Sequence, residues 1–280
     1  MPLTVMLLVL LAALLHAGWN FLVKGLADKQ LSMAAVVVGS GIFAAVVLVA
    51  APMPQTPAIP YIAASIVLHV LYQLGLLAAY EAGELSHVYP LARGLAALLV
   101  ALVSAVVIGE TLSPTEVVAI TLIGGSLASL SITRQQDGLR NFRAALLACL
   151  TAAFIAAYSL MDGHGARAAG TALGYYAWVS IINAVVFLAA MRRVRPAIIN
   201  DLRGRWRLVV VGGGLSFIAY AIVTWAFTVA PIPLVAALRE ASIIFALLLG
   251  VIVLRERLDL AKVVATSGTV FGIALLRLRR

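Results

Sequence analysis

Ten long apolar segments follow one another along this chain, and they constrain its fold more than any other feature. Of all residues 64% are hydrophobic and only 11% are charged, whereas soluble domains are about half apolar and a quarter charged. Each segment has the roughly 20 residues that a membrane-spanning helix needs. The predicted spans are 3–23, 31–51, 58–80, 85–108, 115–133, 142–161, 170–190, 208–229, 233–254 and 260–277.

All ten spans are predicted to be helices, which makes the chain an all-α polytopic membrane protein. Lipid offers the backbone no hydrogen-bond partner, and the alternating pattern of a membrane barrel is absent. The first span follows no basic segment or cleavage site, so it is predicted to be a retained helix and not a signal peptide. Ser113-Pro114-Thr115-Glu116 has the pattern of a capped helix start. Cys149 lies within an apolar run, which favours a packing thiol.

The distribution of Lys and Arg predicts the orientation. Fourteen lie in the connections after spans 1, 5, 7 and 9, and four lie on the opposite side. Cytoplasmic connections concentrate basic residues, so both termini are predicted on the non-cytoplasmic side of a bacterial-type inner membrane. The net charge of +9 is therefore attributed to topology, with the lipid bilayer and not nucleic acid as partner. The basic loop 192–207 also carries Trp206; contact with anionic head groups and simple solvation are the two alternatives.

An internal repeat is visible at an offset of 146 residues. At this offset Arg93 falls on Arg239, and Glu110 falls on Glu256. Five spans, an odd number, separate the copies, so the second copy is predicted to run in the inverted sense. We therefore predict one five-helix repeat over 1–137 and an inverted one over 138–280 around a central cavity.

The chain resembles the EamA-type transporters of the drug/metabolite transporter superfamily. The motifs that carry the resemblance are Ala17-Gly18-Trp19-Asn20, Pro90-Leu91-Ala92-Arg93, Gly109-Glu110-Thr111-Leu112, Gly124-Gly125, Arg255-Glu256-Arg257-Leu258 and Gly268 to Gly272. The resemblance implies a secondary transporter of a small metabolite that works by alternating access, with amino-acid export as the leading expectation. Small multidrug members carry a Glu in their first helix, where this chain has His16, so their proton exchange is not transferred.

Polar and aromatic side chains inside the spans are the candidates for substrate binding, because such groups are costly in lipid. In the first and third spans they recur at helical spacing on one face. The alternative is that they only join helices together. The predicted substrate-binding residues are His16, Trp19, Asn20, His69, Tyr72, Gln73, Tyr80, His87, Tyr89, Arg93, Tyr158, Trp178, Tyr220 and Trp225.

The arginines within the spans are the sharpest candidates. Arg93 and Arg239 each carry a guanidinium that suits a carboxylate or phosphate. The alternative is structural: Arg239 then neutralises Glu240 or Glu110, and Arg93 reaches the interface or pairs with Glu84. Glu110, Arg239, Glu240 and Glu256 are accordingly predicted as structural or gating residues.

Enzyme functions fit the sequence poorly. Asp162-Gly163-His164-Gly165-Ala166-Arg167 matches the opening of a CDP-alcohol phosphotransferase pattern, but the next aspartate, Asp201, lies outside any span. No zinc-binding His-Glu-x-x-His helix, phosphate-binding loop or cysteine cluster occurs, so neither a cofactor nor a metal is predicted. Organic-cation export and, more remotely, lipid processing in the membrane remain the alternatives. The oligomeric state stays open, and a monomer is compatible with the sequence.

The charge distribution makes one direct prediction about topology. A cysteine placed at Asp201 should be labelled by membrane-impermeant reagents only after the cells are opened, because the basic 192–207 segment is expected in the cytoplasm. A cysteine placed at Gln55, in the connection after the second span, is the matched position on the other side. Labelling of the Asp201 position in intact cells would reverse the orientation.

Overall fold

The structure is a computed structural model that describes the chain except for residues 25, 27, 84, 134–141, 255–259 and 279–280. For residues 24, 85–87, 131–133, 254 and 278 it describes the backbone alone. The described residues fold into helices and contain no strand, which confirms the predicted all-α membrane fold.

The helices follow the predicted spans closely. They are α1 (Leu3–Lys24), α2 (Lys29–Leu48), η1 (Thr56–Ala58), α3 (Ile59–Ala82), α4 (Leu85–Val103), η2 (Ser104–Ile108), α5 (Pro114–Thr133), α6 (Phe142–Ala169), α7 (Ala172–Val194), α8 (Ile198–Arg203), α9 (Trp206–Val229), α10 (Ile232–Arg239), α11 (Ser242–Leu254) and α12 (Leu260–Leu278). Within the described residues, nine segments are long and apolar enough to cross a membrane, and Pro114–Leu130 forms a shorter apolar helix.

The helices differ from the sequence prediction in three places. Helix α6 continues to Ala169 and not to residue 161, because its polar end packs inside the bundle. The segment 192–207, expected as a loop, contains the short helix α8. The span expected over 233–254 is two helices, α10 and α11, separated at Glu240 and Ala241.

The capped start of α5 is confirmed in detail. The carboxylate of Glu116 accepts hydrogen bonds of 2.8 Å from both the backbone N–H and the hydroxyl of Ser113. The Ser113 hydroxyl in turn accepts from the backbone N–H of Glu116 at 3.3 Å. These reciprocal bonds satisfy backbone donors that the first turn of a helix leaves open.

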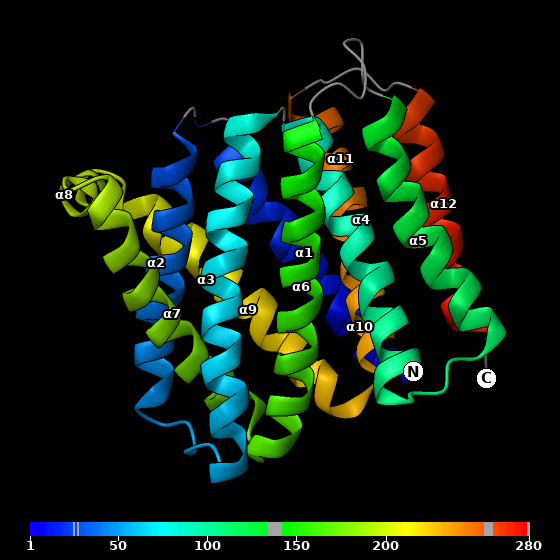
Figure 1. Cartoon of the computed structure of the whole chain (residues 1–280), viewed down its shortest axis with the longest axis horizontal. Helices are drawn as coiled ribbons and strands as arrows, with labels where there is room; N and C mark the ends of the chain where they lie inside the picture. Colours follow the sequence, from blue (N-terminus) through cyan, green and yellow to red (C-terminus); the bar gives the residue numbers. More distant parts are fainter. Residues whose placement is uncertain (25, 27, 84, 134–141, 255–259, 279–280) are drawn as a thin grey trace.

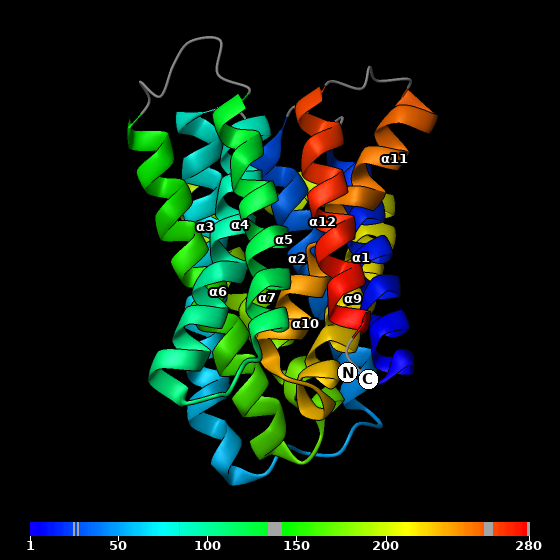
Figure 2. The same cartoon turned by 90° about the vertical axis from the view of Figure 1, so that its right-hand side faces the viewer.

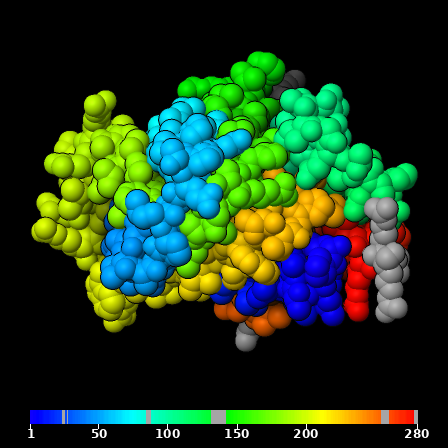
Figure 3. Space-filling view, turned by 90° about the horizontal axis from the view of Figure 1, so that it is seen from below, coloured from blue at the N-terminus to red at the C-terminus, as the bar shows by residue number. Residues whose placement is uncertain are grey.

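The helices form a bundle with both termini at one end (Figures 1 and 2). Helix α3 packs on α6, α5 packs between α4 and α12, and α2 packs against α7 and α9. The α1–α2 connection and α8 lie at the end opposite the termini (Figure 1). Seen from the terminal end, the start of α1 lies beside α12 and the α9–α10 connection (Figure 3). The basic segment that contains α8 and the two termini therefore lie at opposite ends of the bundle.

Arg195 connects α8 to the start of α2 through two ion pairs. The guanidinium of Arg195 pairs with the carboxylates of Asp28 and Asp201, the latter at 2.6 Å. Burial acts to raise the pKa of Asp28, but the hydrogen bonds from Arg195 and from the backbone of Leu31 outweigh it and lower the pKa below its usual value. The stabilisation by Asp28 is therefore present at neutral pH and is lost as the pH falls through this lowered value.

Glycines let two pairs of helices touch at their backbones. A Cβ added to Gly213 on α9 would meet the Cα of Gly39 on α2, and one added to Gly39 would meet the carbonyl oxygen of Val209. Gly94 on α4 and Gly124 on α5 form a similar contact, with a Cβ at Gly124 lying 2.8 Å from the Gly94 carbonyl oxygen. Small residues at such crossings permit the close packing that associates helices in lipid.

The α2–α9 crossing gives a prediction about stability. Gly213→Ala should lower the free energy of unfolding by about 1–3 kcal/mol, because the added methyl overpacks a backbone contact. Gly125→Ala is the matched control: nothing lies within 4 Å of its added Cβ, so the change should be neutral or slightly stabilising in a helix. Thermal unfolding in detergent measures both. Equal effects of the two substitutions would contradict the close crossing.

Candidate functional site

A buried polar cluster lies in the middle of the bundle, where α3, α4, α6 and α9 meet the break between α10 and α11. It contains four charged residues, and the exposed fraction of each is 3% or less. They are Arg93, Asp162, Arg239 and Glu240. Charged groups buried at membrane depth are costly, so each needs a partner or a function.

Glu240 is shared by the two arginines. The Nε of Arg93 donates a hydrogen bond of 2.8 Å to one oxygen of Glu240. The other oxygen lies 3.8 Å from the Nε of Arg239, close enough for an ion pair. Arg239 therefore faces its neighbour Glu240, as the structural alternative predicts, and Arg93 bonds the same carboxylate. Glu84, the expected partner of Arg93, lies outside the described residues. One carboxylate thus faces two guanidinium groups, and the second carboxylate of the cluster, Asp162, is not paired with either of them.

The break between α10 and α11 places Arg239 and Glu240 at helix ends where the helix dipoles stabilise their charges. Arg239 ends α10, and Glu240 and Ala241 form a turn before Ser242 begins α11. In this turn the backbone N–H of Glu240 donates to the carbonyl of Ala237 at 3.0 Å. The helix dipole stabilises a cation at a helix C-terminus, such as Arg239, and an anion just before a helix N-terminus, such as Glu240. Figure 2 shows α10 and α11 as separate ribbons, and no Gly or Pro at residues 238–242 signals this break.

Asp162 is held by hydroxyl groups and not by an arginine. Its carboxylate accepts hydrogen bonds from Ser65 at 2.5 Å, from Tyr220 at 2.6 Å and from Tyr175 at 3.2 Å. These donors come from α3, α9 and α7, so the carboxylate joins three helices to α6. The Nε2 of His69 lies 3.8 Å from the same carboxylate. This dense bonding explains why α6 continues past the polar segment that the sequence suggested as its end.

Aromatic rings connect the aspartate to the arginines. The ring of Tyr158 stacks on His69 with centroids 4.1 Å apart and contacts Tyr72 at 5.4 Å. Tyr220 donates its hydroxyl to Asp162, and its ring centroid lies 5.8 Å from the guanidinium carbon of Arg239. A guanidinium over an aromatic face is stabilised by the ring quadrupole. The charged and aromatic groups thus form one continuous cluster.

Helix α1 joins this cluster through a histidine. The Nε2 of His16 lies 3.3 Å from the hydroxyl of Tyr89, whose ring centroid is 5.9 Å from the guanidinium carbon of Arg93. Trp19 contacts His16 edge to face at 5.0 Å. Asn20 instead donates to the backbone carbonyl of His16 within its own helix.

The predicted site residues divide into two groups. The structure connects eight of them by hydrogen bonds, ring contacts or ion pairs to the central cluster: His16, Trp19, His69, Tyr72, Tyr89, Arg93, Tyr158 and Tyr220. Gln73 is buried, and Tyr80 packs in the same apolar cluster as Tyr72. Asn20 lies beside the group but bonds within α1.

Other predicted residues lie apart or outside the described chain. Trp225 is 38% exposed, and no ring contact or ion pair among the described residues joins it to the cluster, so its role in the site stays a prediction. No interaction among the described residues joins Trp178 to the cluster or Glu110 to Arg239. The side chain of His87 and the whole of Glu256 fall outside the described residues.

Asp162 is the central residue missing from the predicted site. Its sequence context matches the opening of a metal-binding pattern whose further ligands are missing. Among the described residues no group of three or more His, Cys, Asp or Glu side chains could hold a metal. The sequence feature that could have identified Asp162 is a single carboxylate within an apolar run, because an ionisable residue inside a membrane span is a functional candidate.

Two guanidinium nitrogen atoms of the cluster have no hydrogen-bond partner within the described structure. They are the Nη2 of Arg93 and the Nε of Arg239, both buried. An unsatisfied buried donor costs about 1–3 kcal/mol, and more for a charged group. The arrangement can therefore gain free energy by accepting an anionic group such as a carboxylate.

The shared carboxylate predicts a specific pattern of stabilities. Glu240→Gln should destabilise the protein by about 3–5 kcal/mol, because it leaves two buried guanidinium groups without their counter-ion. Adding Arg93→Gln to Glu240→Gln should recover part of this loss, as expected for groups in contact. Thermal unfolding of the purified variants measures both effects.

The control for this rescue is Arg277→Gln, which removes an exposed arginine at the end of α12. Combined with Glu240→Gln it should recover nothing. Recovery by either arginine substitution alike would show that net charge, and not the contact with Glu240, determines stability.

Comparison with known proteins agrees with this architecture. One solved crystal structure of a protein aligns over 99% of this chain and 99% of its own, with a TM-score of 0.74 and 20% sequence identity. At this identity the alignment shows a shared fold alone. No curated protein matches the chain. Residues 142–278, which include Asp162, Arg239 and Glu240, match the EamA-like transporter family. The second half of the chain is thus similar to the EamA-like transporter family.

Proposed function

We propose that this membrane transporter is a secondary carrier that exports an amino acid or a closely related carboxylate by alternating access. The observation that carries the proposal is the pair of unpartnered guanidinium nitrogens, on Arg93 and Arg239, beside a single shared carboxylate. These free donors suit one substrate carboxylate. A guanidinium binds such a group through two parallel hydrogen bonds, which gives geometric specificity as well as affinity.

The surrounding rings suit the rest of an amphipathic substrate. Tyr72, Tyr89 and Tyr158 supply aromatic faces that contact apolar side chains and attract an ammonium group. Asp162 supplies negative charge on the other side of Tyr220 from Arg239. A zwitterion therefore finds positive charge and negative charge at two ends of one cluster.

The repeat supports alternating access around this cluster. Arg93 on α4 and Arg239 on α10 occupy equivalent positions at the offset of 146 residues. Helix α4 enters the bundle from the end that carries α8, and α10 enters from the end that carries the termini (Figure 1). Inverted repeats with a discontinuous helix at the binding site are typical of secondary transporters.

Export of an organic cation is the alternative, and it fits the cluster less well. Glu240 is occupied by arginine, and a cation that has no carboxylate leaves the free nitrogens of Arg93 and Arg239 without a partner. A lipid-processing enzyme of the phosphotransferase type would need clustered carboxylates that bind metal ions, and the described residues bring no such set together.

Transport in proteoliposomes tests the proposal. The purified protein should carry an amino acid, and Arg93→Lys should reduce this transport about tenfold or more, because lysine keeps the charge but loses the planar fork. Transport of the corresponding amide, which lacks the carboxylate, should change little. Arg277→Lys, at an exposed arginine outside the cluster, should leave both activities unchanged.

Two outcomes would contradict the proposal. Equal losses for the acid and its amide would assign Arg93 a structural role only. Transport of organic cations without any transport of amino acids would favour the alternative substrate class.

A further inference from the structure

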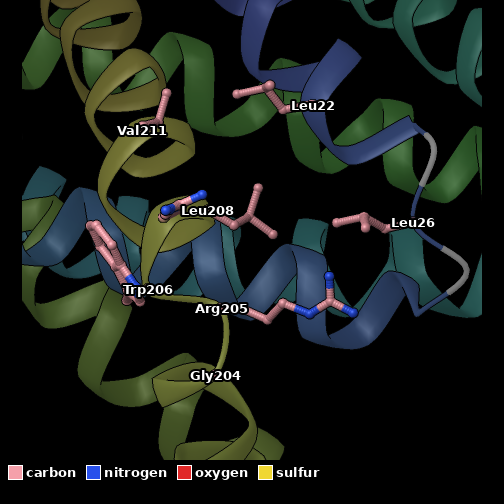
Figure 4. Close-up of a pocket in the computed structure, with 8 residues that line it drawn as sticks. Leu22, Leu26, Gly204, Arg205, Trp206, Leu208 and Val211 are labelled. Atoms are coloured by element: carbon pink, nitrogen blue, oxygen red, sulfur yellow. The ribbon is translucent and has the colours of Figure 1, made fainter.

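A groove opens on the side of the bundle between the end of α1 and the start of α9 (Figure 4). Its volume is about 550 Å³. Four lining residues are purely apolar, and three at the start of α9 carry charged or amphipathic side chains. The lining residues are Leu22, Leu26, Gly204, Arg205, Trp206, Arg207, Leu208 and Val211.

The groove has an apolar part and a basic part. Leu22 and Val211 lie at one end in Figure 4, whereas Trp206 and Arg205 lie toward the other, with Leu208 between them. Leu22 and Val211 are exposed on the surface of spanning helices, so they face the lipid phase. The groove therefore runs from the hydrocarbon region to a basic edge.

The basic edge is not neutralised by the protein. The nearby carboxylates of Asp28 and Asp201 are both bound to Arg195. No carboxylate among the described residues pairs with Arg203, Arg205 or Arg207, all of which are exposed. Three arginines within five positions thus present uncompensated positive charge at the mouth of the groove.

The local fold places this edge at the membrane interface. Helix α8 is seen nearly end-on in Figure 1, whereas the spanning helices run vertically. Its buried Ile198 and Leu202 hold it against the bundle, and Arg203 at its end stays exposed. Trp206, which begins α9, is 60% exposed, and its ring centroid lies 5.6 Å from the guanidinium carbon of Arg207. Exposed tryptophan and arginine at a helix end mark the level of the head groups.

We propose that this groove binds an anionic glycerophospholipid. Its phosphate is held by Arg205 and Arg207, and one acyl chain lies along Leu22, Leu208 and Val211. A lipid satisfies both halves of the groove, because a free phosphate would leave the apolar wall uncovered and a neutral lipid would leave the arginines uncompensated. The site is separate from the buried cluster, and its occupancy does not depend on the proposed substrate.

Native mass spectrometry of the purified full-length protein tests the site. The protein is released from detergent containing equal amounts of phosphatidylglycerol and phosphatidylcholine, without substrate. The wild type should retain phosphatidylglycerol preferentially. Arg205→Gln with Arg207→Gln should lower the retained ratio by roughly 30-fold, the factor expected for removing two basic groups from an anionic lipid.

The matched control removes two other arginines of the same end, Arg192 and Arg193, which end α7 outside the groove. Arg192→Gln with Arg193→Gln should keep the preference. Val211→Ser, which keeps both basic residues, should weaken retention through the apolar wall. Size-exclusion chromatography checks that each variant remains monodisperse.

Three results would overturn the proposal. One is no preference for phosphatidylglycerol in the wild type, and another is equal loss in the two double variants, which would indicate general charge attraction. The third is displacement of the lipid by soluble glycerol phosphate at equal concentration, which would indicate an anion site without an acyl chain.

Discussion

The centre of this bundle depends on one carboxylate that faces two arginines. Glu240 bonds Arg93 from α4 and neutralises Arg239 from its own segment, so it joins both halves of the chain at membrane depth. In a low-dielectric interior neither guanidinium is tolerated without a partner. One carboxylate does not bond every guanidinium nitrogen, and the Nη2 of Arg93 and the Nε of Arg239 lack a hydrogen-bond partner within the described structure.

The second buried carboxylate, Asp162, is bonded by hydroxyl groups, whereas Glu240 is bonded by an arginine. Asp162 is bonded by hydroxyls of Ser65, Tyr175 and Tyr220, which are neutral donors. Tyr220 then presents its ring to Arg239. Hydrogen-bonded networks of this kind hold side chains in defined positions, because losing one member leaves others unsatisfied. The aspartate therefore orients the aromatic groups, while in the proposed function the arginines supply the attraction for an anion.

Most residues of the cluster could be predicted from the sequence, because polar side chains are energetically costly in lipid and therefore stand out within apolar spans. His69, Tyr72, Tyr89 and Arg93 stand out against apolar runs at helical spacing, and the structure brings them together. Trp225 obeys the same pattern but is 38% exposed, and composition does not decide its place, since an aromatic ring is tolerated both in a cavity and against lipid. The partner of Arg93 was not predictable: Glu240 lies 147 residues away, and only the packing of α4 against α10 brings them into contact.

The sequence by itself determined the membrane class, the approximate spans and the unequal distribution of basic residues, because hydrophobic length and charge are local properties. Tertiary structure decided the break at Glu240, the continuation of α6 through Asp162 and the docking of α8 by Arg195. No residue type at 238–242 breaks a helix by its own preference. These features arise where side chains distant in the chain satisfy buried charges, and a local pattern does not carry that information.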